Sequence, residues 1–251
     1  MGRAEGVFPC ILVPHYNHDR QIRPVIAALG QLGFPVLVID DGSAAESFKA
    51  VRDFVANLPW VYLHREPQNR GKGAAVMCGL RIAAARGYSH AVQIDADGQH
   101  CIGDIPALLD LARERPESLV SGSPVYDATV PSARLYGRKI SLFWARLETW
   151  SWDIQDPMCG FRVYPVARII ALVESGPGME FDVEILVRAH WAGIPLQFFP
   201  TAVTYPPEGL SHFRMFRDNV RISAMHTRLF FGMVRRIPVV IASRLGRKAL
   251  V

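Results

Sequence analysis

The sequence predicts an α/β fold with a mostly parallel central sheet and helices on both of its faces. Two observations support this prediction. Short apolar runs rich in β-branched residues alternate with segments of helical periodicity through residues 1–120, which is the pattern of a parallel sheet. Each of the first four apolar runs also ends in a polar cluster, and sheets of this kind bind their ligands at the carboxyl ends of the strands.

The individual elements follow from run length and spacing. Apolar runs too short for a helix predict buried strands at 10–14, 35–40, 60–65 and 90–95. Apolar residues at helical spacing predict helices at 20–33, 44–58, 73–87 and 102–116, with stops at Gly33, Gly87 and Pro116. Further on we expect a strand at 118–125, a helix at 133–152, a loop entering a short strand at 153–165, a helix at 179–193 and a strand at 194–207.

Composition indicates one globular body, residues 1–210, followed by a helical extension, residues 211–251. Hydrophobic residues make up 50% of the chain and charged residues 20%, as in ordinary domains with a sizeable core. The four cysteines lie far apart without Cys-x-x-Cys or Cys/His clustering. This spacing argues against a structural zinc site and favours free thiols in a reducing compartment.

The start of the sequence has no long apolar run and no cleavage signature, which predicts no signal peptide. No stretch approaches the apolar length that is needed to cross a bilayer. We therefore expect a cytoplasmic protein.

The positive charge is concentrated in the extension. From residue 211 onward nine Lys or Arg residues accompany a single acid, Asp218, so that the net charge of +5 for the chain leaves the first 210 residues at −3. Arginines alternate there with aromatic and aliphatic residues, which is typical of a basic amphipathic helix resting on anionic lipid. The alternative is a helix packed on the body with solvated arginines. Two adjoining apolar stripes are expected at helical spacing: Ile222, Met225, Leu229 and Met233, and next to them Phe213, Phe216 and Val220.

Two aspartates, Asp95 and Asp97, follow the fourth predicted strand. Residues two apart in an extended chain share a side, and neighbouring carboxylates repel each other unless a cation lies between them. Carboxylate oxygens suit Mg²⁺ or Mn²⁺, and Gln99 and His100 can add a ligand. The alternative is a turn with solvated acids. A phosphatase Asp-x-Asp-Gly-Thr segment is excluded by Gln99 and by its place on the fourth strand, and an EF-hand loop lacks its required Gly and Glu.

The segment NRGKGAA, residues 69–75, begins a predicted helix with small residues and one lysine, Lys72. Backbone amides and Lys72 can face an anion there. The segment is neither a P-loop nor a dinucleotide-binding turn, because Gly73 follows Lys72 and the segment comes after the third strand. The alternative is a glycine-relieved helix start with a solvated lysine.

The chain resembles the family 2 glycosyltransferases in five segments taken in order: VPHYNH, VIDDGS, NRGKGAA, IDADGQH and DPMCGFRVYP. It is most similar to the polyprenol-phosphate mannosyl- and glucosyltransferase branch, and the resemblance spans about residues 8–205. It implies the nucleotide-sugar-binding fold known as GT-A. It also implies transfer of a hexose from UDP- or GDP-sugar, with inversion, to an acceptor that is lipid-linked, such as polyprenyl phosphate, or small.

The same resemblance assigns roles to residues. It places Asp95, Ala96 and Asp97 at the metal and the donor diphosphate, with help from Gln99, and Lys72 beside the nucleotide. It places Asp156, Arg162, Asp182 and Glu184 on the acceptor side. The nucleoside pocket would be lined by Pro14, Tyr16, Asn17, Asp40 and Asp41. His15 and His18 depart from the family, in which small or acidic residues are more usual.

The chemistry depends on the acceptor. A hydroxyl acceptor needs a carboxylate base, for which Asp156, Asp182 and Glu184 are candidates. A phosphate acceptor is already ionised and needs arginines to position it. Arg162 is the first choice, and Arg134 and Arg138 are further ones. For Asp182 and Glu184 the alternative is an acid pair that the helix dipole favours.

The sequence offers two alternative functions. A sugar-phosphate nucleotidyltransferase would need a glycine-rich loop after the first strand, where the chain has PHYNHDR. A nucleic-acid-binding protein would use the basic extension, but the clusters of the body are acidic, so we expect no nucleic-acid partner. The sequence therefore favours a metal-dependent glycosyltransferase that lies peripherally on the cytoplasmic face of a membrane.

Overall fold

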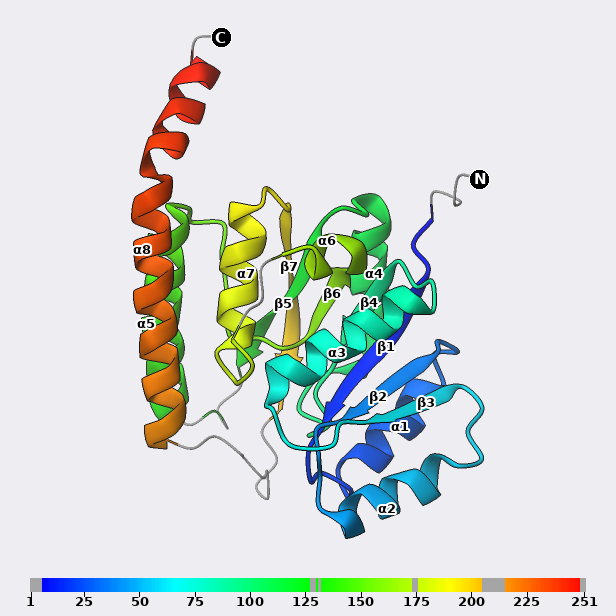
Figure 1. The fold of residues 1–251 in the computed structure, drawn as a ribbon. Coiled ribbons are helices and arrows are strands. Elements are labelled where there is room, and N and C mark those ends of the chain that lie inside the picture. The colour runs from blue at the N-terminus through cyan, green and yellow to red at the C-terminus, as the bar shows by residue number, and fades with distance from the viewer. Residues whose placement is uncertain (1–5, 127–129, 131, 173–175, 205–214, 249–251) are drawn as a thin grey trace.

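The computed structural model describes residues 6–126, 130, 132–172, 176–204 and 215–248. One seven-stranded sheet runs through the molecule in the order β3-β2-β1-β4-β6-β5-β7 (Figure 1). Its strands are β1 (Pro9–His15), β2 (Val36–Asp40), β3 (Val61–Arg65), β4 (His90–Gln93), β5 (Leu119–Tyr126), β6 (Arg162–Pro165) and β7 (Leu196–Val203). The predicted α/β class is confirmed.

The sheet is mostly parallel, as predicted. Strands β3, β2, β1 and β4 run parallel to one another, and so do β5 and β7. Strand β6 is antiparallel to both of its neighbours, β4 and β5. The first half of the sheet therefore presents the carboxyl ends of four adjacent strands at one edge.

Two helical layers cover the sheet. On one face lie α1 (Ile22–Gly30), α2 (Ala45–Val55) and α4 (Ile105–Glu114), which share a core with Ile11 and Val13 of β1. On the other face lie α3 (Lys72–Ala85), α6 (Val166–Ile170), α7 (Phe181–Trp191) and the helices α5 (Ser132–Thr149) and α8 (Met215–Lys248), with a core that includes Leu12. Because β1 is buried on both faces, its sequence reads as a continuous apolar run rather than an alternating one.

Two local differences from the predicted elements have simple causes. The helix expected at 102–116 is divided into a 3-10 turn, Ile102–Asp104, and α4. Pro106 lacks a backbone N–H and is tolerated only in the first turn of a helix, so α4 begins next to it. The five-residue helix α6 was not predicted, because so short a segment gives no periodic signal.

Helix α8 packs on the body along part of its length. Met225, Leu229 and Met233 are buried. Met225 and Leu229 belong to the core that also contains residues of α7, and the partly buried Ile222 packs against it. This stripe therefore faces protein, which was the alternative to the lipid-facing interpretation. Of the second stripe, Val220 is 53% exposed, whereas Phe213 and the side chain of Phe216 lie outside the described part. Among the described helices, none combines the length and the apolar character required of a membrane span.

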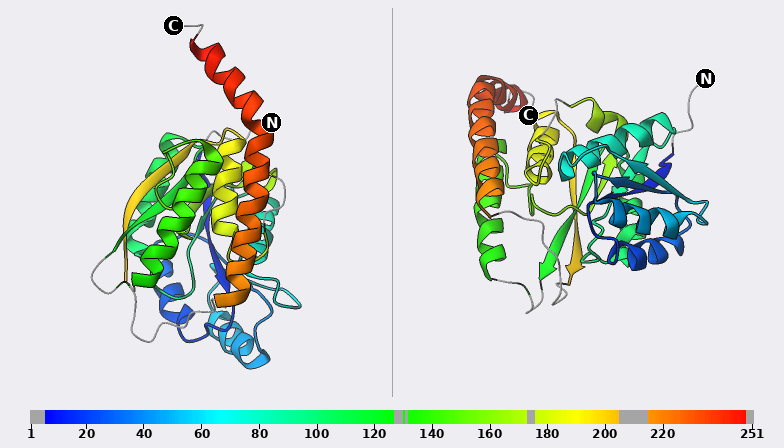
Figure 2. Two further views of the ribbon diagram at one scale, coloured as in Figure 1. Left: turned by 90° about the vertical axis from the view of Figure 1, so that its left-hand side faces the viewer. Right: turned by 60° about the horizontal axis from the view of Figure 1, so that its bottom comes forward.

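Helices α5 and α8 lie side by side at the edge of the molecule, next to α7 (Figures 1 and 2). A buried pair joins them, since His226 Nδ1 lies 2.8 Å from Glu148 Oε1. The last turns of α8 project beyond the body, whereas its first turns lie near the carboxyl ends of the central strands (Figure 2). The start of α8 is therefore close to the edge of the sheet where ligands are expected.

Candidate active site

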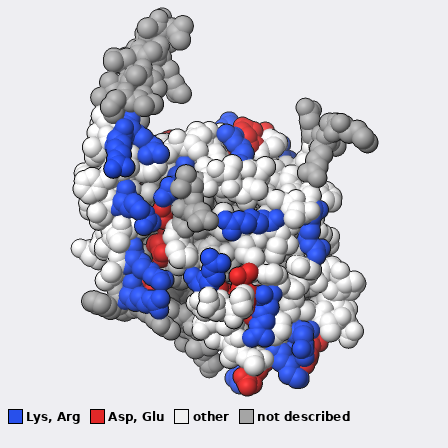
Figure 3. Space-filling view, viewed as in Figure 1, with Lys and Arg blue, Asp and Glu red and all other residues white. Residues whose placement is uncertain are grey.

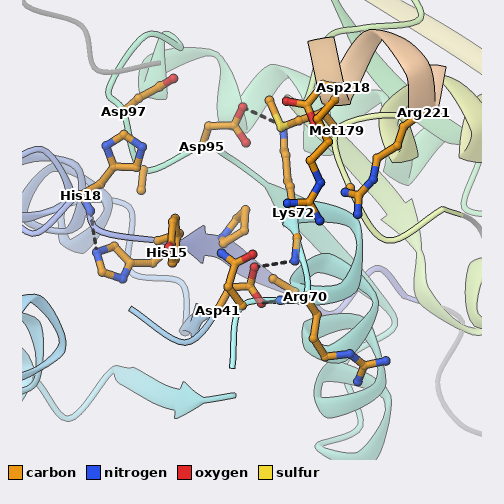
Figure 4. A pocket seen from close by; sticks show the side chains of 18 residues that line it. His15, His18, Asp41, Arg70, Lys72, Asp95, Asp97, Met179, Asp218 and Arg221 are labelled. Carbon is orange, nitrogen blue, oxygen red and sulfur yellow. Dashed lines mark hydrogen bonds and ion pairs between the residues drawn. The ribbon is translucent and has the colours of Figure 1, made fainter. Parts of the chain in front are cut away.

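A pocket of about 320 Å³ lies at the carboxyl ends of β1, β2 and β4 (Figure 4). We call it the strand-end pocket. Segments that are far apart in the sequence line it: Pro14 and His15 at the end of β1, Tyr16 and His18 after β1, Asp41 after β2, Asn69 to Lys72 and Ala75 at α3, Asp95 to Asp97 after β4, Gly178 and Met179 before α7, and Arg217, Asp218 and Arg221 of α8.

The structure brings together seven of the predicted site residues. Pro14, Tyr16, Asp41, Lys72, Asp95, Ala96 and Asp97 all line the strand-end pocket. The other seven do not line it: Asn17, Asp40, Gln99, Asp156, Arg162, Asp182 and Glu184. Most of these seven hold neighbouring segments in place, as their hydrogen bonds show.

Lys72 is the central cation of the pocket. Its Nζ lies 2.9 Å from Asp95 Oδ2 and 2.9 Å from Asp182 Oδ2, and its side chain is only 15% exposed. Burial favours loss of its proton, but Asp182 and Asp95 outweigh that effect and hold the pKa of Lys72 well above its ordinary value. Lys72 is therefore a paired, charged ammonium and not a solvated one.

Two glycines allow this position of Lys72. Gly71 has a φ of +104°, and a Cβ there would lie 2.5 Å from Pro177 O. A Cβ at Gly73 would lie 2.5 Å from Phe181 Cβ. The Gly-Lys-Gly sequence thus lets the start of α3 pack against the segment before α7. This packing places the Lys72 side chain between Asp95, after β4, and Asp182, in α7.

The two carboxylate oxygens of Asp95 have different surroundings. Its Oδ2 contacts Lys72 and lies 3.6 Å from His100 Nε2, while its Oδ1 is buried and has no hydrogen-bond partner among the described residues. Burial opposes its ionisation, but the positive charge of Lys72, the nearby His100 and the hydrogen bond from Lys72 hold the pKa of Asp95 well below its ordinary value. The carboxylate is therefore ionised and keeps one oxygen for another ligand.

Asp97 completes the acidic end of the pocket. Its Oδ1 accepts a hydrogen bond of 3.0 Å from the backbone N–H of Gln99. Burial, followed by the negative charge of Asp95, raises the pKa of Asp97. Two neighbouring carboxylates and one unpartnered buried oxygen suit a hard divalent cation, whose remaining ligands would be water and substrate phosphate. The residues therefore fit Mg²⁺ or Mn²⁺.

The nucleoside side of the pocket is built on hydrogen bonds between loops. Asp40 is fully buried, and its Oδ1 lies 2.9 Å from His15 Nδ1. Burial raises its pKa, but hydrogen bonds with His15 and Ser43 outweigh burial and lower the pKa of Asp40 below its ordinary value. Asn17, at a φ of 53°, accepts a hydrogen bond from the Ala44 N–H. Asp40 and Asn17 thus position the loops that follow β1 and β2.

Asp41 both lines the pocket and fixes its floor. Its two carboxylate oxygens accept hydrogen bonds from the backbone N–H groups of Arg70, at 2.8 Å, and Gly71, at 2.7 Å. Asp41 therefore ties the end of β2 to the segment that presents Lys72.

On the expected acceptor side, Arg162 and Glu184 are fully buried. Arg162 donates hydrogen bonds to Ser121 Oγ at 3.2 Å, to Asp182 O at 2.7 Å and to Pro157 O at 2.9 Å. An arginine enclosed in this way holds β6 against α7 and does not reach a ligand in the pocket. The contacts of Arg162 favour a structural role, and its contact with the acceptor phosphate stays a prediction.

The carboxylates of this side also have partners. Asp156 accepts hydrogen bonds from Arg138 Nη1 at 2.6 Å and from the Met158 N–H at 2.8 Å. Glu184 contacts Arg188 and Arg228, at 2.6 and 2.9 Å. Of the three candidate bases, Asp182 is the one that contacts a residue lining the pocket, Lys72. The side chain of Arg134 lies outside the described part.

Sequence reasoning missed the contribution of α8 to the pocket. Arg217, Asp218 and Arg221 line it, although these residues were assigned to a separate basic extension. Met179 and Arg70 also line it. The only sequence signal was the spacing of four between Arg217 and Arg221, in the segment that follows the last predicted strand.

Comparison with known proteins identifies relatives along most of the chain. The polyprenol monophosphomannose synthase of Mycolicibacterium smegmatis is 28% identical over 222 residues, which are 84% of this chain and 82% of that protein. The undecaprenyl-phosphate mannosyltransferase of Micrococcus luteus is 26% identical over 213 residues, 74% of this chain and 82% of that protein. Both names belong to the branch that the five sequence segments resemble.

Solved structures share the fold. The glucosyl-3-phosphoglycerate synthase of Mycobacterium tuberculosis, in complex with Mn²⁺ and uridine-diphosphate-glucose, matches with a TM-score of 0.65 at 17% identity. The match covers 96% of this chain and 80% of that one. At this identity the likeness concerns the fold alone, and it agrees with the predicted GT-A arrangement.

The model of the family described as glycosyl transferase family 2 matches residues 10–168. This range spans β1 to β6 and includes Asp41, Lys72, Asp95 and Asp97, and so contains most of the strand-end pocket. The match also decides between the leading interpretation and the nucleotidyltransferase alternative. The chain belongs to glycosyl transferase family 2 and is a glycosyltransferase.

Proposed function

We propose that this glycosyltransferase moves a hexose from UDP- or GDP-hexose to polyprenyl phosphate, with inversion and with a divalent metal ion. The observation that carries the proposal is the pair Asp95 and Asp97 in one pocket with Lys72. One buried Asp95 oxygen has no hydrogen-bond partner in the part of the chain that the structure describes. The names of the relatives support the sugar and acceptor classes, since one is named a polyprenol monophosphomannose synthase and another an undecaprenyl-phosphate mannosyltransferase.

The donor would lie across the ends of β1, β2 and β4. Its nucleoside would meet Pro14, Tyr16 and Asp41, on loops that Asn17 and Asp40 hold in place. Asp95 and Asp97 would hold the metal, and Gln99 would be a further ligand. A divalent ion there would supply positive charge that stabilises the departing diphosphate. Lys72 keeps Asp95 ionised and in position through its 2.9 Å contact.

The acceptor determines whether a base is needed. A phosphate monoester is ionised at neutral pH and attacks the anomeric carbon without losing a proton. Asp182 and Asp156 would act as a base only for a hydroxyl acceptor. Attack from the side opposite the diphosphate inverts the configuration of the anomeric carbon.

A thermal-shift panel tests the donor assignment. We expect at least one of UDP-, GDP- and dTDP-hexose to raise the melting temperature by several degrees in the presence of Mn²⁺, because ligand at about 100 times its Kd stabilises the folded state by roughly 2.7 kcal/mol. The shift should shrink when the metal is chelated. If no nucleotide sugar stabilises the protein under either condition, the donor assignment fails.

We further propose that the protein lies peripherally on the cytoplasmic face of a membrane and meets it through α5 and α8. Tyr136, Ile140 and Phe143 of α5 are 70%, 46% and 62% exposed and recur at helical spacing. Lys and Arg side chains form a row along α8 (Figure 3). Apolar residues beside arginines are typical of contact with anionic lipid.

Vesicle flotation tests this membrane contact. We expect binding to phosphatidylglycerol vesicles that weakens as salt rises, because salt screens exposed charges. The variant Ile140→Ser, which replaces an exposed apolar side chain of α5, should bind these vesicles more weakly than the wild type at each salt concentration. Binding to neutral phosphatidylcholine vesicles that equals binding to anionic ones, at every salt concentration, would contradict the proposal.

A further inference from the structure

The side of the strand-end pocket away from the nucleoside loops is formed by α8. Arg217 and Arg221 line the pocket there and, four residues apart, share one side of the helix. Figure 4 shows Arg221 and Asp218 across the pocket from His15 and His18. A ligand that fills the pocket would therefore meet the nucleoside loops at one end and two guanidinium groups at the other.

These two arginines differ from others of the molecule in having no carboxylate partner among the described residues. Arg138 pairs with Asp156, and Arg188 and Arg228 both pair with Glu184. Within the described part of the chain, Arg217 and Arg221 form neither a hydrogen bond nor an ion pair with a side chain. Two such cations in one pocket wall favour an anionic ligand.

The acids nearby do not neutralise this wall by direct pairing. Asp218 lines the pocket but is only 7% exposed and has interactions of its own. Glu180 is buried, and its Oε1 accepts a hydrogen bond from the Gly178 N–H. Glu180 Oε2 and Arg221 Nη1 both come within 3 Å of the place that a Cβ on Gly178 would take, so this acid lies beside Arg221 without pairing with it.

We propose that Arg217 and Arg221 form the subsite for the phosphate monoester of the acceptor. This inference rests on the proposed function. The donor diphosphate already has a place for a cation at Asp95 and Asp97 and does not require these arginines. A second phosphate must lie beside the anomeric carbon, and the α8 wall provides positive charge at the other end of the same pocket.

The step that this subsite serves is a single displacement. An oxygen of the acceptor phosphate forms a bond to the anomeric carbon, and the bond from that carbon to the donor diphosphate breaks. The electron pair leaves with the nucleoside diphosphate, and no proton is transferred. Arg217 and Arg221 would hold the attacking phosphate in line, and bidentate contacts of guanidinium with phosphate fix its direction.

Polyprenyl phosphate and a small phosphorylated acid both present a phosphate monoester. The surroundings favour the lipid. Val220 follows Arg217 by three residues and is 53% exposed on α8, while Tyr136 and Ile140 are exposed on α5, which packs beside α8. A prenyl chain leaving the subsite would find apolar side chains on the same two helices, which a small acid would not use.

Steady-state kinetics of Arg217→Gln, Arg221→Gln and the double variant test the subsite. The acceptor probes are polyprenyl monophosphate in neutral detergent micelles and phosphoglyceric acid. We expect the double variant to raise the KM for polyprenyl phosphate by about 10–100-fold or more, since a hydrogen bond to a charged group contributes about 1.5–3 kcal/mol. We expect the thermal shift by nucleoside diphosphate to change little, whereas kcat at saturating acceptor should fall as well, because the attacking phosphate is no longer held in line.

Controls separate the outcomes. Arg235→Gln, an exposed α8 residue that does not line the pocket, should behave as wild type. Arg→Lys at both positions should recover part of the affinity, because charge is kept and the fork is lost. Melting temperatures show whether each variant is folded. If the Gln variants do not fold, the same kinetic comparison is made with the Lys variants.

Three results would overturn the inference. The first is an unchanged acceptor KM in a folded double variant that still binds nucleoside diphosphate. The second is weakened binding of nucleoside diphosphate with an unchanged acceptor KM, which would assign the arginines to the donor. The third, which would overturn the lipid as acceptor, is transfer to phosphoglyceric acid but not to polyprenyl phosphate. If wild type binds no nucleotide sugar, it is the proposed function that fails, whatever the variants do.

Discussion

Asp95→Asn should lower kcat for sugar transfer by about 10²–10³-fold, which corresponds to several kcal/mol of activation free energy. The amide keeps the shape of the side chain but removes the charge that faces Lys72 and the proposed metal. The buried Oδ1, to which no described residue donates a hydrogen bond, is the atom through which the carboxylate would hold a cation. Steady-state rates with a nucleotide sugar and polyprenyl phosphate measure the loss.

Loss of metal binding can be distinguished from loss of folding in Asp95→Asn. Lys72 retains Asp182 as a partner at 2.9 Å, so Asp95→Asn should remain folded. The thermal shift that nucleotide produces should lose its dependence on Mn²⁺. Asp110→Asn, at an exposed residue of α4, is the matched control and should keep full activity. Undiminished turnover in Asp95→Asn, or a metal-dependent shift equal to that of wild type, would refute the role given to this carboxylate.

Arg162→Met should lower the free energy of unfolding by about 3 kcal/mol, because each buried acceptor left without a donor costs about 1–3 kcal/mol. Three oxygens lose their donor: Ser121 Oγ, Pro157 O and Asp182 O. For a chain of this size the melting temperature should fall by roughly 6–12 °C. Urea denaturation followed by circular dichroism measures the change.

This result distinguishes a positioning residue from a ligand-binding one. If Arg162 contacted the acceptor phosphate, Arg162→Met would raise the acceptor KM and leave stability unchanged. Arg162→Lys should also destabilise, since an ammonium cannot reach three acceptors that a guanidinium fork serves. Arg113→Met removes an exposed arginine of α4 and should change the free energy of unfolding by less than about 1 kcal/mol.

The part of the site that the sequence predicted consists of residues next to strand ends. Asp41, Lys72, Asp95 and Asp97 lie close to the ends of β2, β3 and β4 in the sequence, and parallel strands place such ends at one edge. Local periodicity was sufficient for this, because it identifies the strands and therefore also their ends. The family segments then supplied the chemistry.

The residues that were assigned differently are those whose surroundings come from distant segments. Asp182 and Glu184 stand two apart in the first turn of α7, yet Asp182 contacts Lys72 whereas Glu184 pairs with Arg188 and Arg228. Arg162 is enclosed by groups from β5, α7 and the loop before β6. Sequence spacing gives the direction of a side chain on its own element but not what that side chain meets.

By itself the sequence determined the mostly parallel class of the sheet, the alternation of strands and helices along its first half, and the acidic strand ends at which a metal and a diphosphate would meet. These features depend on short-range patterns of polarity. Only the tertiary structure decided what α8 does. An amphipathic helix has an apolar side whether protein or lipid covers it, and here Met225 and Leu229 pack on the body while Arg217 and Arg221 turn to the pocket. Burial is a property of contacts between segments far apart in the chain, and no local pattern contains it.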